Sequence, residues 1–277
     1  MFVHRYGTGS RIFFGLHGWS GTHQTFAPFA QHLPADVSLF AVDLPANGKS
    51  PRPTEWSLEW FENALGEVMA KLPGERFTLI GNCSGALLGL LGAARVMPRI
   101  ERFVLLDPFA YTPWYFRLFL VPLLGEVAYY SSFANPLGRW LTNLSLAKHR
   151  QGESDLTESF ERVDHESALR YLKLFDELGS IERFRPLVAP TDIFYGAHTF
   201  AAVKSSVTLW QSLWPHATAQ AVEAGHLPIE EAPAQLSRLI FDTRMTRMQR
   251  IGAEQHHPPE SAASASSAYP FTIIPNL

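Results

Sequence analysis

The sequence is poor in cysteine, because Cys83 is the only one among its 277 residues. A single cysteine permits no internal disulfide, and such a composition is typical of proteins from reducing compartments. The first ten residues also lack the basic, apolar and small-residue order of a secretory signal. We therefore predict a cytoplasmic location.

Long hydrophobic runs are missing as well. A membrane-spanning helix needs about 20 consecutive apolar residues, whereas the nearest segment, residues 111–130, is interrupted by Arg117, Pro122, Gly125 and Glu126. Charge of one sign is not in excess either, since the formal net charge is −3. That balance gives no overall attraction to nucleic acid or to anionic membranes. We expect no membrane span and no nucleic-acid partner.

Apolar material, by contrast, is plentiful. Hydrophobic residues make up 46% of the chain and aromatic residues 13%, which suffices for a substantial core. Short apolar runs typical of buried strands alternate with longer segments of helical periodicity. The predicted strands are 11–16, 37–42, 77–80, 100–106, 191–195 and 218–222, and the predicted helices are 24–33, 58–72, 84–97, 201–213 and 233–248. This alternation predicts an α/β fold with a mostly parallel, doubly covered sheet.

The alternation is interrupted once. Residues 109–185 show no strand pattern and are rich in aromatic side chains, so we predict an all-helical cap inserted after the strand at 100–106. Residues 1–108 and 186–250 would then form the α/β core. Residues 251–277 shift to His, Pro, Ala and Ser, which predicts a flexible C-terminal tail.

The segment Gly-Asn-Cys-Ser-Gly at 81–85 follows a predicted strand and opens a predicted helix. This spacing is typical of a nucleophile elbow, in which the flanking glycines let the strand and the helix approach closely. The raised residue would be Cys83, and the Ser84 amide would face a developing oxyanion. Ser84 is the weaker nucleophile candidate, because shifting the frame by one residue puts side chains at both crowded positions.

In these features the sequence resembles the α/β-hydrolase family over about residues 10–245. The similar segments are Leu-His-Gly-Trp at 16–19, Val-Asp-Leu-Pro-Ala-Asn-Gly-Lys-Ser at 42–50, the elbow at 81–85 with cysteine in place of the usual serine, and Ala-Gly-His-Leu-Pro-Ile-Glu-Glu-Ala-Pro at 224–233. The resemblance implies that the Trp19 amide is a second oxyanion donor. It also implies that His226 is the general base.

The acid of the implied triad departs from the common pattern. Many family members carry an aspartate after the next-to-last strand, where this chain has Thr199. Other members place the acid after the strand that follows the elbow helix, which implies Asp107 here. Asp107 would accept the second imidazole proton of His226. A Cys/His dyad without an acid stays open, because a thiol needs less help from a base than a hydroxyl does.

This residue set predicts acyl chemistry without a metal or an organic cofactor. A thiolate would attack an ester or thioester, and His226 would then activate water or another acceptor to release the acyl group. Hydrolysis, transfer and cyclisation all remain open, as does delivery of a small-molecule acyl substrate on coenzyme A or a carrier protein. Attack on a carbon bearing a halide is disfavoured, because the similar haloalkane dehalogenases use a carboxylate nucleophile.

Substrate contacts are predicted at the carboxyl ends of the strands, where ligands bind in open α/β sheets. The aromatic cap favours an apolar acyl or ring-bearing substrate, with Trp114 in contact, while His198 either contacts substrate or fills the space of the missing acid. His256 and His257 have no third ligand at metal spacing, so no metal site is predicted. The alternative hypothesis is a catalytically inactive protein that keeps the pocket and binds a small molecule.

Overall fold

The computed structural model describes residues 1–152 and 154–241, and residues 1–240 form one compact unit. In these residues seven strands form a sheet in the order β1-β3-β2-β4-β5-β6-β7. The strands are β1 (Val3–Tyr6), β2 (Arg11–Leu16), β3 (Val37–Val42), β4 (Phe77–Asn82), β5 (Ile100–Leu106), β6 (Thr191–Gly196) and β7 (Thr218–Val222). Only the edge strand β1 is antiparallel to its neighbour.

The six strands predicted from the sequence are confirmed. Strands β2 to β6 are buried along almost their whole length, which explains their continuous apolar runs. The pattern did not predict β1, because its sequence Val-His-Arg-Tyr is half-exposed and mixes apolar with charged residues. The order brings β2, β4 and β5 side by side, so the loops after these strands meet at one edge of the sheet.

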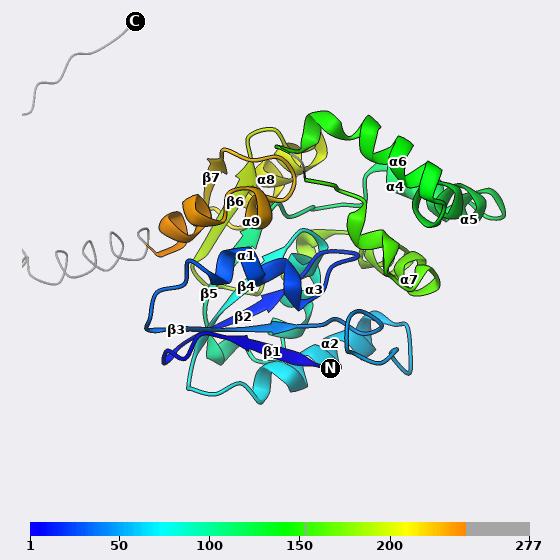
Figure 1. Cartoon of the computed structure of the whole chain (residues 1–277). Helices are drawn as coiled ribbons and strands as arrows, with labels where there is room; N and C mark the ends of the chain where they lie inside the picture. The colour runs from blue at the N-terminus through cyan, green and yellow to red at the C-terminus, as the bar shows by residue number, and fades with distance from the viewer. Residues whose placement is uncertain (153, 242–277) are drawn as a thin grey trace, which may run out of the picture. The chain divides into compact units, whose positions relative to one another are not determined.

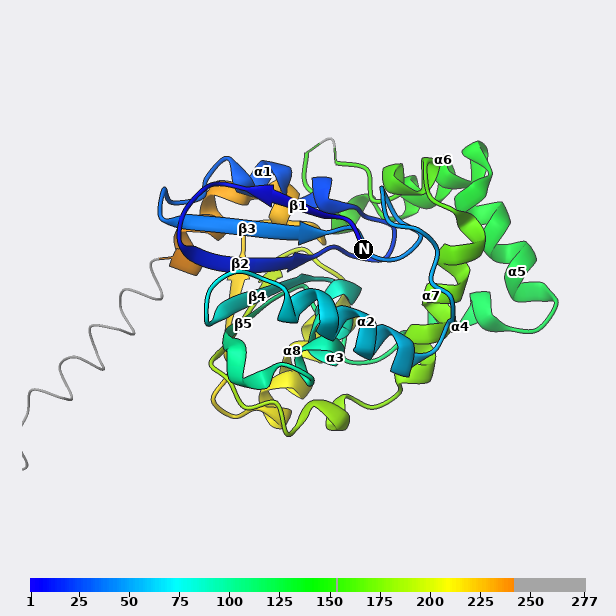
Figure 2. The same ribbon diagram turned by 90° about the horizontal axis from the view of Figure 1, so that it is seen from below.

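Helices cover both faces of the sheet (Figure 2). One face carries α2 (Leu58–Ala70), α3 (Ser84–Ala93) and α8 (Ala201–Leu213), and the other carries α1 (Ala27–Ala30) and residues 233–240. The helix predicted at 24–33 is shorter, because a 3-10 turn at His23–Phe26 precedes α1. The helix predicted at 84–97 ends at Ala93. For the predicted helix 233–248, residues 242–248 lie outside the described residues.

A helical insertion joins β5 to β6 and lies beyond the carboxyl ends of the strands (Figure 1). It contains α4 (Trp114–Arg117), α5 (Leu124–Tyr129), α6 (Pro136–Ser145) and α7 (His165–Leu178), and α9 (Pro228–Glu231) follows β7. Further short turns lie at Met97–Arg99, Leu118–Leu120, Tyr130–Ala134 (π-helical), Ala147–His149, Glu158–Glu161 and Ile181–Phe184. The cap limits 109–185 and the core limits 1–108 and 186–250 stay predictions, and the tail 251–277 lies outside the described residues. No helix in the described part of the chain is long and apolar enough to cross a bilayer.

The turn from β4 into α3 brings backbone segments unusually close together. Cys83 adopts φ 52° and ψ −122°, a conformation that costs energy for a residue with a side chain. A Cβ on Gly81 would lie 2.4 Å from the Ala86 Cα, and one on Gly85 would lie 2.2 Å from the His17 carbonyl oxygen. Glycine is therefore required on both sides of Cys83.

Replacing Gly85 with alanine is expected to lower the thermal unfolding midpoint, because the methyl group meets backbone atoms that cannot move away. Overpacking of this kind costs about 1–3 kcal/mol. The matched control is Gly89→Ala in the same helix, whose Cβ meets only methyl ends of Leu16 and Leu79 at 3.0 Å. Thermal unfolding followed by circular dichroism compares the two, and equal midpoints would contradict the close approach at position 85.

Candidate active site

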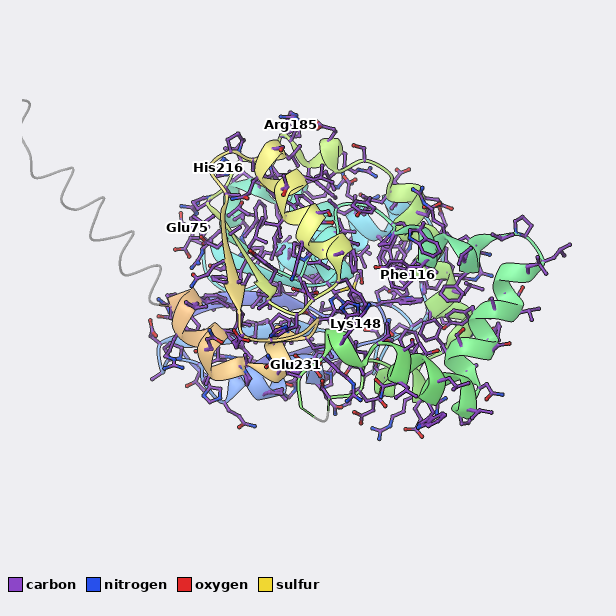
Figure 3. The ribbon with its side chains drawn as sticks, turned by 90° about the horizontal axis from the view of Figure 1, so that it is seen from above. Glu75, Phe116, Lys148, Arg185, His216 and Glu231 are labelled. Atoms are coloured by element: carbon purple, nitrogen blue, oxygen red, sulfur yellow. The ribbon has the colours of Figure 1, made fainter. Side chains whose placement is uncertain are left out.

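A cavity of about 410 Å³ lies between the elbow and the helical insertion. Its floor includes Asn82, Cys83 and Ser84 of the elbow, and Gly18 and Trp19 of the loop after β2. Figure 3 shows Phe116, another lining residue, between the insertion and the α/β core. The cavity thus stands at the carboxyl edge of the sheet, as the sequence predicts.

The loops after β5 and β7 bring Asp107 and His226 together. The His226 Nδ1–H donates to Asp107 Oδ2 at 2.7 Å. The same carboxylate, which is fully buried, accepts the Gly196 amide at Oδ1 (2.7 Å) and the Thr199 hydroxyl at Oδ2. Three donors therefore compensate its burial. The His226 amide in turn donates to the His149 carbonyl of the insertion at 2.7 Å.

His226 also lines the cavity that contains Cys83. Burial alone lowers the pKa of the imidazole, but the negative charge of the Cys83 sulfur and the hydrogen bond with Asp107 raise it. A hydrogen bond with Cys83 and the charge of Asp107 act in the same direction, and the resulting pKa is about 10. The imidazole ring is therefore positioned between the sulfur and the carboxylate.

His17 shapes the loop that carries Gly18 and Trp19. Its Nε2 accepts the Leu44 amide at 3.0 Å, so its Nδ1–H is the donor to the Gly18 carbonyl at 2.8 Å. Burial lowers the pKa of His17 to about 4, which keeps the ring neutral. The Trp19 indole donates to the Ala168 carbonyl of α7 at 2.6 Å. The backbone of this loop is thus fixed from both sides beside the cavity.

The predicted oxyanion donors lie beside Cys83. Trp19 and Ser84 both line the cavity. Ser84 is the first residue of α3, so its amide has no carbonyl partner within the helix. An unpaired amide at a helix N-terminus is suited to bind a developing negative charge.

Two predicted substrate contacts are placed elsewhere. The Trp114 side chain is 72% exposed and does not line the cavity. His198 points to the surface, where its Nε2 lies 3.1 Å from Glu223 Oε1. Neither side chain contributes to the lining of the cavity, so contact of Trp114 or His198 with a substrate stays a prediction.

Three aromatic residues that sequence reasoning did not single out surround the imidazole and the cavity. The rings of Phe200 and Phe109 lie 4.7 and 5.7 Å from the His226 ring, and the Phe116 ring lies 6.1 Å from that of Phe109. Phe109 follows Asp107 by two residues and Phe200 comes directly after Thr199, so proximity to the acid position was their available signal. No group of three metal-ligating side chains occurs within residues 1–152 and 154–241.

Comparison with known proteins gives relatives of the same fold. The chain is 31% identical over 96 residues to a Drosophila melanogaster protein named "Probable serine hydrolase", a match that covers 33% of this chain and 29% of that protein. A hydrolase from Oleispira antarctica superposes with a TM-score of 0.70 at 16% identity, covering 88% of this chain and 94% of the other. An enol-lactonase from Burkholderia xenovorans superposes with a TM-score of 0.65 at 18% identity, covering 88% and 96%.

The sequence model of the protein family described as "alpha/beta hydrolase fold" matches residues 12–233, which include the elbow, Asp107 and His226. The sheet order, the position of the insertion and the histidine loop after β7 agree with that match. The chain belongs to the α/β-hydrolase fold family.

Proposed function

We propose that this α/β hydrolase cleaves an ester of an apolar acyl group through a covalent acyl-enzyme on Cys83. His226 is the general acid and base, and Asp107 orients it. The observation that carries the proposal is the buried Asp107–His226 hydrogen bond of 2.7 Å, with the opposite side of the imidazole facing the cavity beside Cys83. Nucleophile, base and orienting acid are the recurring parts of such a site.

The geometry of the elbow favours Cys83 over Ser84 as the nucleophile, although the Drosophila relative is named a serine hydrolase. The strained residue with positive φ is Cys83, and the two glycines that the elbow needs flank it. Ser84 is already part of the helix, as the first residue of α3. Its role in the proposal is to donate its amide to the oxyanion.

The first chemical step forms a bond between the Cys83 sulfur and the acyl carbon. The Trp19 and Ser84 amides stabilise the negative charge on the carbonyl oxygen. When the tetrahedral intermediate collapses, the bond from carbon to the leaving oxygen breaks, and the imidazolium of His226 donates its proton to that oxygen. A neutral imidazole and a thioester remain.

Acylation itself prepares the second step. The sulfur loses its negative charge in the thioester, so the charge that raises the pKa of His226 disappears. The imidazole can then act as a base, taking a proton from water while the oxygen attacks the thioester carbon. Breaking the carbon–sulfur bond restores the thiolate and the imidazolium. An alcohol or amine in place of water would make the same reaction a transfer.

The cavity lining favours an apolar acyl group. Side chains from α3, from the loops after β5 and β6, and from the insertion with its helix α7 contribute large apolar surfaces. These residues are Leu87, Phe109, Phe116, Phe133, Leu146, Phe160, Leu172, Phe175, Leu178 and Phe200. We assign the acyl contacts to this set instead of to Trp114 and His198.

Charged groups at the same cavity favour an uncharged ester over a thioester of coenzyme A or of a carrier's phosphopantetheine arm. Asp155 and Glu158 contribute two carboxylates, against the single guanidinium of Arg162, and Glu230 adds a third carboxyl group, whose pKa burial raises to about 7. Phosphate groups would meet a net negative charge there. The substrate class that fits is a small neutral ester or lactone.

Intact mass measurement after mixing with 4-nitrophenyl esters of increasing chain length tests the acyl-enzyme. We expect one acyl adduct on the wild-type protein and none on Cys83→Ala. Cys83→Ser is expected to cleave the same esters more slowly, because a hydroxyl is harder to ionise than a thiol. Adduct that persists in Cys83→Ala but is lost in Ser84→Ala would contradict the assignment. Ester binding with neither adduct nor product would favour the inactive binding protein.

Asp107→Asn is expected to lower kcat at least about 100-fold, because the carboxamide has no charge and, with its oxygen on the Gly196 amide, turns its NH2 group toward Nδ1, which selects the wrong tautomer of the imidazole. Steady-state hydrolysis of the best ester measures the change. The matched control is Asp176→Asn, which removes only a surface ion pair with Arg117 at 2.9 Å and should leave kcat unchanged. Full activity of Asp107→Asn would instead favour a Cys/His dyad.

The pKa of His226 is expected to fall in Cys83→Ala. In the wild type the ring is protonated below about pH 10, and the sulfur charge is the largest influence that raises this value. Without the charge on the sulfur, the ring should lose its proton at a lower pH than in the wild type. The neutral imidazole should therefore appear earlier as the pH is raised. NMR titration of the His226 ring measures the shift. An unchanged pKa would show that the sulfur does not act on the ring.

A further inference from the structure

The side chain of Asn82 lies at the floor of the cavity without a hydrogen-bond partner. The residue is 2% exposed and lines the cavity directly before Cys83. Its Oδ1 is enclosed and unpaired, and no hydrogen bond joins its carboxamide to any other residue of 1–152 and 154–241. Most buried polar side chains in proteins are paired, so an unpaired carboxamide beside a reactive group calls for an explanation.

Asn82 stands on the side of Cys83 where the oxyanion is expected. A Cβ added to Gly18 would lie 3.5 Å from the Asn82 Nδ2 and 3.3 Å from the Cys83 Cβ. Gly18 directly precedes Trp19, whose amide is the second oxyanion donor in the proposed function. The carboxamide, the nucleophile and the oxyanion loop thus meet at one point of the cavity floor.

The oxygen of the reacting carbonyl group can accept one more hydrogen bond in the tetrahedral intermediate than in the substrate. A substrate carbonyl oxygen has two lone pairs, which the Trp19 and Ser84 amides can occupy. The oxygen of the tetrahedral intermediate has three lone pairs and a full negative charge. A third donor therefore gains its partner only as the intermediate forms, and such an interaction raises kcat without tightening substrate binding.

We propose that Asn82 is a further catalytic residue, whose side-chain amide donates a third hydrogen bond to the oxyanion. This proposal rests on the acyl-enzyme mechanism proposed above. It assigns a function to the residue before the nucleophile, in addition to the two backbone donors. Among the described residues the Nδ2 group has no acceptor in the free protein, and the oxygen of the reacting ester supplies one, whereas the enclosed Oδ1 is itself an acceptor and takes no part in this hydrogen bond.

The test is Asn82→Leu, which removes the donor and keeps a side chain of similar size. We expect kcat for a 4-nitrophenyl ester to fall about 100-fold, the magnitude seen when one oxyanion donor is removed, with KM within a factor of three. Thermal stability should stay equal or rise, since no hydrogen bond is lost. Asn82→Asp should lose as much activity, because a carboxylate cannot donate to an oxyanion.

Alkylation of Cys83 by iodoacetamide separates this role from an effect on the thiol. That reaction forms no oxyanion, so its rate should be the same in wild type and Asn82→Leu. Asn135→Asp is the matched control, because Asn135 caps α6 outside the cavity and aspartate caps a helix equally well. Its kcat should be that of the wild type.

Several results would overturn the assignment. Unchanged kcat in Asn82→Leu would exclude a donor, and a rise in KM alone would indicate ground-state binding. A loss of kcat together with lower thermal stability and slower alkylation would indicate a structural role.

The Ser84 hydroxyl is also enclosed and unpaired, so Ser84→Ala is measured as well. A larger loss of kcat in Ser84→Ala than in Asn82→Leu would favour the Ser84 hydroxyl as the third donor. If the wild type forms no acyl adduct, the mechanism itself fails; an adduct with unchanged Asn82→Leu kinetics refutes only the third donor.

Discussion

The candidate site depends on the contact between two backbone segments where β4 turns into α3. Glycines at 81 and 85 let the chain pass within van der Waals distance of Ala86 and of the His17 carbonyl, and Cys83 between them takes a positive φ. That turn directs the sulfur into the cavity and the first amides of α3 toward the same space. Because β2 and β4 are neighbours in the sheet, the loop with Trp19 reaches this point as well.

The sheet could be predicted from the sequence because its central strands are buried on both faces. Their continuous apolar runs leave little ambiguity about position, whereas β1, a half-exposed edge strand, carries no such run. The first helix was overestimated because amphipathic spacing continues through a 3-10 turn and a four-residue helix. Hydrophobic patterns in the sequence thus predicted which segments are buried, but they did not predict the exact ends of the helices.

That Cys83, Asp107 and His226 come together could also be predicted, since each follows a strand at the same edge of the sheet, while their catalytic roles stay a proposal. Their partners could not. Thr199 looked like an empty acid position, yet its hydroxyl donates to Asp107, and this contact depends on how the loops after β5 and β6 fold together. Trp114 is a large aromatic residue of the kind expected in a pocket, but its side chain faces solvent. An aromatic-rich helix carries rings on several sides, and composition alone does not say which of its faces is covered.

The placement of Asp107 links the acid to the insertion through the covalent chain. The carboxylate lies at the end of β5, and the segment that continues from it carries Phe109 into the cavity and then becomes the first cap helix. The insertion also returns to the histidine loop, where the His149 carbonyl accepts the His226 amide. A chimaera that exchanges this insertion for that of another α/β hydrolase would therefore have to preserve both junctions, or it would change the electrostatics at the imidazole along with the shape of the pocket.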